Sequence, residues 1–185
     1  MKINIKLDTR STKAAIRNVR KYQQRLDKAC RRYVEELANV GIRTAKIYEG
    51  NYSGYILYAK QISEKSHGGA TCIMIASGRE VERIWKKGGS FERRTVDALL
   101  MSEFGSGWLA DNDNQWGVAG VGQGTFPHQI HATDPDGWWW KDEKGVTHHS
   151  IGEAPSYPMY NAFMEMERQL LTIGKKVFGE VLKHG

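Results

Sequence analysis

IRNVRKYQQRLDKACRRYVEELANVGIRTAKIY, residues 16–48, contains a long periodic pattern. Apolar side chains recur every three or four positions and Arg or Lys occupies many of the others, as in an amphipathic helix. The pattern predicts one helix of about ten turns, or two helices broken near Gly41. The side-chain oxygens of Asp8 or Ser11 are suited to cap its first turn. A helix of about 35 residues runs about 50 Å, so we expect a neighbouring subunit to cover part of its apolar stripe.

Shorter patterns lie on either side of this helix. Residues 3–7 alternate apolar and polar side chains, which predicts a short strand. Residues 50–69 contain four glycines and indicate turns around one uncertain short element. ATCIMIAS, residues 70–77, is an apolar run that predicts a buried strand. The spacing over residues 96–104 favours a short helix over a strand, after a turn at residues 87–90.

Three patterns organise the second half of the chain. Residues 108–133 are rich in Gly, Asn, Asp and Gln and predict a long loop, which tends to be functional or to order on a partner. GWWWKDEKGVTHHS, residues 137–150, predicts a β-hairpin with a polar loop that ends in Gly145. Pro158 suits the first turn of a final amphipathic helix. These elements predict one α+β domain over residues 1–185, with a long N-terminal helix and a C-terminal helix packed on a small antiparallel sheet.

Composition excludes several classes of protein. The chain of 185 residues is 40% apolar and 10% aromatic, which argues against disorder, and no run of about 18 apolar residues could cross a bilayer. The N-terminus lacks the apolar core of a signal peptide, so we expect folding inside the cell and no membrane partner. Cys30 and Cys72 lie far apart without CxxC spacing, which predicts reduced, partly buried thiols.

Charge is distributed unevenly along the chain. Residues 1–65 contain 15 Lys and Arg against 6 Asp and Glu, whereas residues 66–185 contain 12 against 15, and the whole chain carries +6. The basic excess is therefore confined to the N-terminal part. It fits contact with nucleic acid, and it fits equally an acidic neighbour in an assembly.

The sequence lacks the motifs of common catalytic and phosphate sites. It contains no GxSxG, GxxxxGK[ST] or HExxH motif. GVAGVGQGT, residues 117–125, lacks the Lys and the following helix of a phosphate loop. We therefore predict that the protein is not an enzyme and holds no cofactor.

Histidines and carboxylates between residues 111 and 149 leave a metal-dependent nucleic-acid-processing enzyme as an alternative. The candidate ligands are Asp111, Asp113, His128, His131, Asp134, Asp136, His148 and His149. Zinc takes imidazole ligands, and nucleases hold Mg²⁺ with paired carboxylates. However, the Asp pairs lie in turn-like sequence, and the adjacent His148 and His149 point to opposite faces of a strand. We therefore predict no metal site.

The tryptophan triplet has the residue type of a platform for a sugar or a base. On a strand, however, Trp138 and Trp140 face one way and Trp139 faces the other, so the three rings cannot form one flat surface. One face can join the core while the other meets a partner, since buried Trp is a frequent interface anchor.

Aromatic and arginine side chains are the candidate contacts for a subunit or a partner, because these types dominate interface energetics. They are Tyr22, Arg31, Arg32, Phe104, Trp108, Trp116, Phe126, Trp138, Trp139 and Trp140. A basic DNA-binding module is a further alternative. In that case Arg17, Arg20, Arg31 and Arg32 would contact phosphates.

Four segments in chain order carry a family resemblance. They are Ala45-Lys46, DALLMSEFGSG at 97–107, the hairpin at 137–150 and GEAPSYPMYNAFMEME at 152–167. Together they resemble the small head-tail joining proteins of long-tailed bacteriophages, which are called neck, tail-completion or minor tail-component proteins. SEFGSG resembles the family's acidic-aromatic-Gly-Thr-Gly segment, and APSYPMYNAF resembles its proline-aromatic lead into the last helix. YEGNYSG, residues 48–54, departs from the Pro-Val-Asp-Thr-Gly type of segment that often follows the helix.

The resemblance implies a non-enzymatic, structural virion protein. It would form an oligomeric ring at the head-tail junction and connect the portal complex to the tail tube. The implied partners are further copies of the chain, with six favoured over twelve, and other neck and tail-tube proteins. Assembly would take place in the host cytoplasm. A ring around a DNA channel would also bring the basic half near DNA, where contact with phosphates is electrostatic and independent of sequence.

Overall fold

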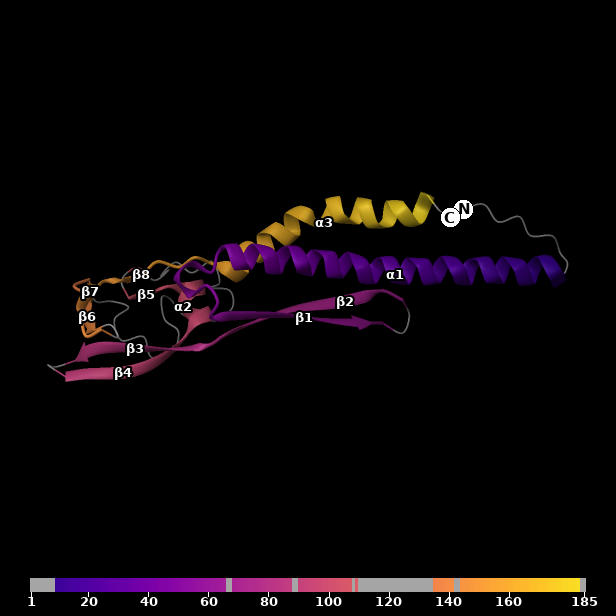
Figure 1. Ribbon diagram of the computed structural model, residues 1–185. Helices are drawn as coiled ribbons and strands as arrows, with labels where there is room; N and C mark the ends of the chain where they lie inside the picture. Colours follow the sequence, from indigo (N-terminus) through magenta and orange to yellow (C-terminus); the bar gives the residue numbers. More distant parts are fainter. Residues whose placement is uncertain are drawn as a thin grey trace. The chain divides into compact units, whose positions relative to one another are not determined.

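The computed structural model describes residues 9–65, 68–87, 90–107, 109, 135–141 and 144–183. Within these ranges the chain is α+β, as predicted, with a long N-terminal helix, a C-terminal helix and small sheets (Figure 1). The predicted strand at residues 3–7 and the predicted cap Asp8 lie outside the described residues. The same holds for the predicted loop at residues 108–133, apart from Leu109.

The chain divides into two compact units. The first unit comprises Met1–Ile42, Ala59–Ile75 and Phe163–Gly185, and the second comprises Arg43–Tyr58 and Ala76–Ala162. Each unit therefore combines segments that are far apart in the sequence. The single domain over residues 1–185 stays a prediction.

The N-terminal helix α1, Thr9–Ile47, is one continuous helix of 39 residues. It passes Gly41 without a break, so the single-helix prediction is confirmed and the two-helix alternative is wrong. The helix has closely packed neighbours at this glycine, because a Cβ atom there would lie 2.7 Å from Met166 Sδ and 2.9 Å from Met74 Sδ. Ser11 lies inside the helix, which begins two residues earlier, so the prediction of Ser11 as the cap residue is wrong.

A β-hairpin follows α1. β1, Ile56–Glu64, and β2, Ala70–Gly78, form a two-stranded sheet, and their short connection requires an antiparallel arrangement. β2 confirms the predicted strand at residues 70–77, but the prediction that it is buried is wrong. Burial alternates along β2, because Cys72 and Met74 face the helices while Ile73 and Ile75 face outward. β1 occupies residues for which the sequence predicts only turns around a short element.

The C-terminal helix α3, Pro158–Lys183, begins at the predicted proline. In the first unit its buried Ile173 and Val177 pack against Ala29 of α1. The small side chain of Ala29 allows the two helices to approach closely. Tyr33, Leu37, Val40, Phe178 and Val181 surround this core.

The second unit contains a four-stranded antiparallel sheet in the order β4-β3-β6-β7. Its strands are β3, Glu80–Lys87, β4, Ser90–Asp97, β6, Trp138–Lys141, and β7, Thr147–Ser150. β6 and β7 confirm the predicted hairpin. β3 and β4 form a second hairpin, with Glu80 opposite Asp97 and Trp85 opposite Glu92. The sequence predicts only a turn there, because its mixed periodicity does not distinguish the two strands.

Short elements complete the second unit. α2, Ala98–Phe104, confirms the predicted short helix, although Val96 belongs to β4. Asp97 caps α2, since one carboxylate oxygen accepts hydrogen bonds from Leu99 N at 2.8 Å and Leu100 N at 3.0 Å. The 3-10 helix η1, Gly50–Tyr52, and the strand pair of β5, Ser106–Gly107, with β8, Gly152–Glu153, lie in the same unit. Tyr52, Ile56, Ala98 and Met101 form its buried core.

Candidate functional site

Two distant segments of the second unit, residues 97–107 and 152–161, are held together by hydrogen bonds, and we call them the clasp. Ser102 O accepts from Ser156 N at 2.8 Å and from Tyr157 N at 3.2 Å. The hydroxyls of Ser102 and Ser156 lie 2.8 Å apart, and Ser102 Oγ donates to Glu49 O at 3.0 Å. Both hydroxyls are therefore engaged in holding backbone in place, and the clasp has the geometry of a structural element.

Glu103 in the clasp caps the start of α3. Glu103 is only 5% exposed, and its carboxylate accepts hydrogen bonds from Met159 N at 2.7 Å and Tyr160 N at 3.0 Å. The first amides of a helix have no partner within the helix, and a negative charge beside them is favourable. Tyr157, just before the helix, has a positive φ of 55°. The buried acid therefore stabilises the entry of the chain into α3.

Other carboxylates in the second unit have similar structural roles. The Glu153 carboxylate accepts from Asn51 Nδ2 at 2.7 Å and from Tyr52 OH at 2.8 Å. Glu49 Oε2 accepts from Gly54 N at 3.1 Å. Burial, followed by the negative charges of Glu49 and Glu103, raises the pKa of Tyr58, so this phenol stays protonated at neutral pH. Sequence reasoning assigned no role to these acids, because their partners come from distant segments.

The tryptophan hairpin presents one described aromatic side chain. Trp138, Trp139 and Trp140 lie opposite Ser150, His149 and His148 in β7. The Trp139 ring is 53% exposed, and its centroid lies 4.7 Å from that of the His149 ring. Trp139 therefore retains its predicted place as a candidate partner contact. The structure describes the backbone of Trp138 and Trp140 only.

The proposed metal ligands do not converge in the part of the chain that the structure describes. Those residues contain no group of three or more His, Cys, Asp or Glu side chains that could hold a metal ion. His148 and His149 are adjacent on β7, and His149 Nε2 lies 2.7 Å from Asp136 O. Asp111, Asp113, His128, His131 and Asp134 lie outside the described residues.

The remaining predicted contacts are divided between the two units or lie outside the described residues. Tyr22, Arg31 and Arg32 lie on α1 in the first unit, and Phe104 ends α2 in the second. Trp108, Trp116 and Phe126 lie outside the described residues. Arg31 pairs with Glu64 at 2.8 Å, and Arg32 pairs with Glu36 at 2.7 Å and Glu180 at 2.6 Å. The guanidinium of Arg32 lowers the pKa of Glu36, and Lys176 adds to the effect.

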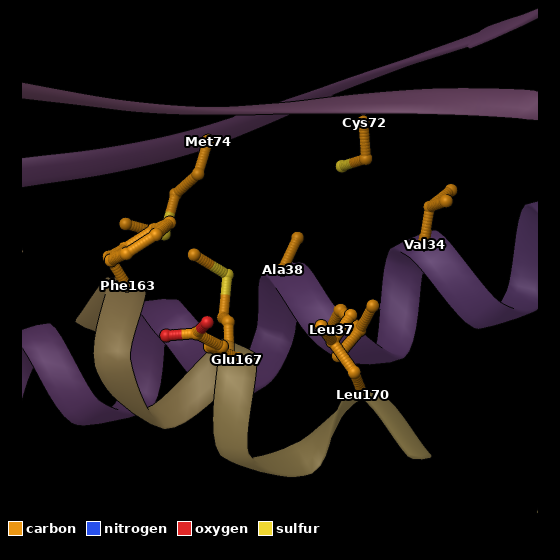
Figure 2. A pocket seen from close by; sticks show the side chains of 9 residues that line it. Val34, Leu37, Ala38, Cys72, Met74, Phe163, Glu167 and Leu170 are labelled. Atoms are coloured by element: carbon orange, nitrogen blue, oxygen red, sulfur yellow. The ribbon is translucent and has the colours of Figure 1, made fainter. Parts of the chain in front are cut away.

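The first unit contains an apolar groove that sequence reasoning did not find. Figure 2 shows side chains from α1, β2 and α3 turned toward a common space of about 370 Å³. Its lining consists of Val34, Leu37, Ala38, Cys72, Met74, Phe163, Met166, Glu167 and Leu170. Apart from the Glu167 carboxylate and the Cys72 thiol the lining is apolar, so it suits an apolar side chain of a partner.

Further apolar side chains of the first unit face solvent. Ile73 is 54% exposed and Ile75 is 43% exposed on the outward face of β2, and Leu171 of α3 is 76% exposed. Within the described residues, β1 and β2 pair only with each other, so each strand leaves one edge without a partner. Exposed apolar side chains and unpaired strand edges are both features of surfaces that associate. The sequence ATCIMIAS does not show that one face of the strand is exposed, because apolar residues lie on both faces.

Cys72, whose side chain is drawn in Figure 2, provides a test of the groove environment. Burial raises the pKa of its thiol above the usual 9.0, with Lys60 opposing the shift. The thiolate fraction at pH 8 should therefore be smaller in the folded protein than in the unfolded one. In a Cys30→Ser background, we expect the alkylation rate of Cys72 to rise with pH along a curve whose midpoint lies above 9. The same protein in urea should give a lower midpoint, and coincident midpoints would contradict the burial of this thiol.

In the described part of the chain, no helix is long and apolar enough to cross a membrane. Cys30 and Cys72 are free and partly buried, as predicted. No known protein family, curated protein or solved structure matches the chain.

Proposed function

We propose that this chain is a structural virion protein of a tailed phage that forms an oligomeric ring at the head-tail junction, in the neck or in tail completion. It would connect the portal complex to the tail tube. The observation that carries the proposal is the outward face of β2 in the first unit, where Ile73 and Ile75 are exposed. Within the described residues, β1 and β2 each leave one edge unpaired beside this face. A further copy of the chain would cover it, while the apolar groove lies on the other face of β2.

The clasp supports the same proposal from the second unit. The segments SEFGSG and APSYPMYNAF, which carry the family resemblance, contact each other through Ser102, Glu103 and Ser156. Their polar side chains serve to hold backbone and to cap a helix. This use fits a protein whose segments are kept for their structure, and it agrees with the absence of catalytic motifs in the sequence.

The proposal is tested by the oligomeric state of the full chain. Sedimentation velocity and negative-stain microscopy should show rings, with six subunits favoured over twelve, either for the protein alone or with its neck and tail-tube partners. Ile73→Asp places a charge on the outward apolar face and should weaken association at least tenfold, because a buried charge without a partner is costly. Ser53→Asp adds the same charge at an exposed turn and serves as the matched control.

Two outcomes would overturn the proposal. One is a monomer at all concentrations, both alone and with the neck and tail proteins. The other is a stoichiometric metal together with nuclease activity, both lost in His148→Ala, which would favour the metal-dependent enzyme. If Ile73→Asp and Ser53→Asp weakened association equally, the outward face of β2 would not be the subunit contact.

A further inference from the structure

α1 carries an exposed basic face in the first unit. Nine Lys and Arg residues lie between Arg10 and Arg32, against the single acidic residue Asp27. At about 100° per residue, all nine fall within a sector of about 140°, and they extend over about 33 Å of helix axis. They are Arg10, Lys13, Arg17, Arg20, Lys21, Arg25, Lys28, Arg31 and Arg32. All except the partly buried Arg25 are exposed.

Most of these positive charges are not neutralised by the described part of the protein. The ion pairs of the face lie at its C-terminal end, where Arg31 contacts Glu64 and Arg32 contacts Glu36 and Glu180. Over the ranges that the structure covers, no carboxylate pairs with the six exposed cations nearer the N-terminus. These are Arg10, Lys13, Arg17, Arg20, Lys21 and Lys28. Six cations on one face repel one another, and a polyanion would relieve that repulsion.

We propose that this face binds the phosphate backbone of double-stranded DNA without reading its sequence. Cations that replace the counterions condensed on DNA release them into solution, and this release drives binding. Six of the nine basic residues are arginines, which bind phosphate oxygens through two parallel hydrogen bonds. The inference goes beyond assembly at the head-tail junction and does not depend on it, since it requires only α1.

The geometry favours a duplex over a single strand. Proteins that bind single strands stack bases on aromatic side chains, whereas the basic sector contains no aromatic residue and Tyr22 projects from the apolar side of α1. A straight helix fits the major groove of B-form DNA, which is about 12 Å wide. The major groove of an RNA duplex is too narrow to admit side chains. DNA is therefore the duplex that matches this face.

A membrane surface fits the same helix less well. A helix that lies in a membrane interface inserts a free apolar face, commonly with Trp, Phe or Leu. From Ala29 onward, the apolar side of α1 is already packed against Ile173 and Val177 of α3. Before Ala29, the exposed large apolar residues are Ile16, Val19 and Leu26, and none of them is aromatic. The apolar surface that α1 could insert into a membrane is therefore limited to three aliphatic side chains.

Fluorescence anisotropy with a labelled DNA duplex of about 30 base pairs tests the proposal on the full chain. If about five phosphates are contacted, the logarithm of the association constant should fall with the logarithm of salt concentration with a slope of about −4 to −5. Affinity should therefore fall several hundred-fold between 50 and 200 mM salt. The quadruple variant Arg17→Gln, Arg20→Gln, Lys21→Gln and Lys28→Gln should reduce the steepness of this slope by about 3 to 4. Gln keeps a high helix propensity, so α1 should be retained.

A second quadruple variant tests whether the position of the charges matters, and not the net charge alone. Lys65→Gln, Arg79→Gln, Lys175→Gln and Lys183→Gln remove the same charge from exposed positions outside α1 and should leave the slope nearly unchanged. Arg17→Lys with Arg20→Lys keeps the charge and should retain binding. Equal losses in the two quadruple variants, or binding to anionic phosphatidylserine vesicles but not to DNA, would overturn the proposal. Sedimentation of each variant reports assembly separately, so failure of DNA binding is distinguishable from failure of the ring.

Discussion

Replacing Gly105 by Ala should lower the free energy of unfolding of the second unit by about 3–5 kcal/mol, because backbone strain and overpacking add. Gly105 follows α2 with φ 71° and ψ −163°, a conformation that side chains with a Cβ atom strongly disfavour. A Cβ atom there would also collide with Glu153 O and would lie 2.8 Å from Pro155 N. These are backbone atoms of the clasp, so they cannot move aside without breaking it.

Gly54→Ala is the matched control for Gly105→Ala. Gly54 lies in the same unit and also has a positive φ, of 81°, but no atom lies within 4 Å of the position its Cβ would take. Its cost should be limited to the backbone term of about 1–2 kcal/mol. All six tryptophans lie between Ala76 and Ala162, so tryptophan fluorescence during urea unfolding reports on the second unit. Equal losses in the two variants would contradict the close contact of Gly105 with β8.

Replacing Glu103 by Ala should lower the free energy of unfolding by about 2–4 kcal/mol, because it leaves two helix amides without an acceptor. Met159 N and Tyr160 N each donate to this carboxylate. Because the site is buried, water cannot readily take its place as the acceptor. Helix content measured by circular dichroism should fall along with the urea midpoint, since the start of α3 is released. The loss would show that Glu103 stabilises the start of α3.

Two further variants calibrate the Glu103 result. Glu103→Gln keeps one carbonyl oxygen but presents an NH₂ group to the second amide, so its loss should fall between those of the wild type and the Ala variant. Glu80→Ala removes the same charge from an exposed position of β3 in the same unit and should change stability by less than about 0.5 kcal/mol. A loss in Glu80→Ala as large as that in Glu103→Ala would indicate a general effect of charge.

Elements with strong local periodicity could be predicted from the sequence. The stripe of α1, the proline that begins α3 and the Trp-rich hairpin each carry their signal within one segment. β1 and the β3–β4 hairpin could not be predicted, since β1 is rich in polar side chains and the period over β3 and β4 is mixed. Their stability depends on neighbours that are distant in sequence. The sequence predicts β2 as a strand, but the apolar Ile73 and Ile75 on its outward face give it the composition of a fully buried strand.

The candidate surfaces were harder to predict than the fold. The groove joins α1, β2 and α3, and no single segment carries its signal. The carboxylates of the clasp are ordinary in sequence and become informative only when their backbone partners are known. By contrast, the basic face of α1 is visible from helical spacing alone, because all of its residues lie on one element.

The pairing of β5 with β8 has a consequence for how this chain can vary. Gly107 lies opposite Gly152, and a Cβ atom at Gly137 would touch Ser150 O, so residues 107 and 137 both lie beside the same short stretch of chain. Gly107 and Gly137, which flank the intervening sequence, are thus held near residues 150–152. Both contacts are made by residues that flank the intervening sequence, so a change in its length leaves the contacting atoms unchanged.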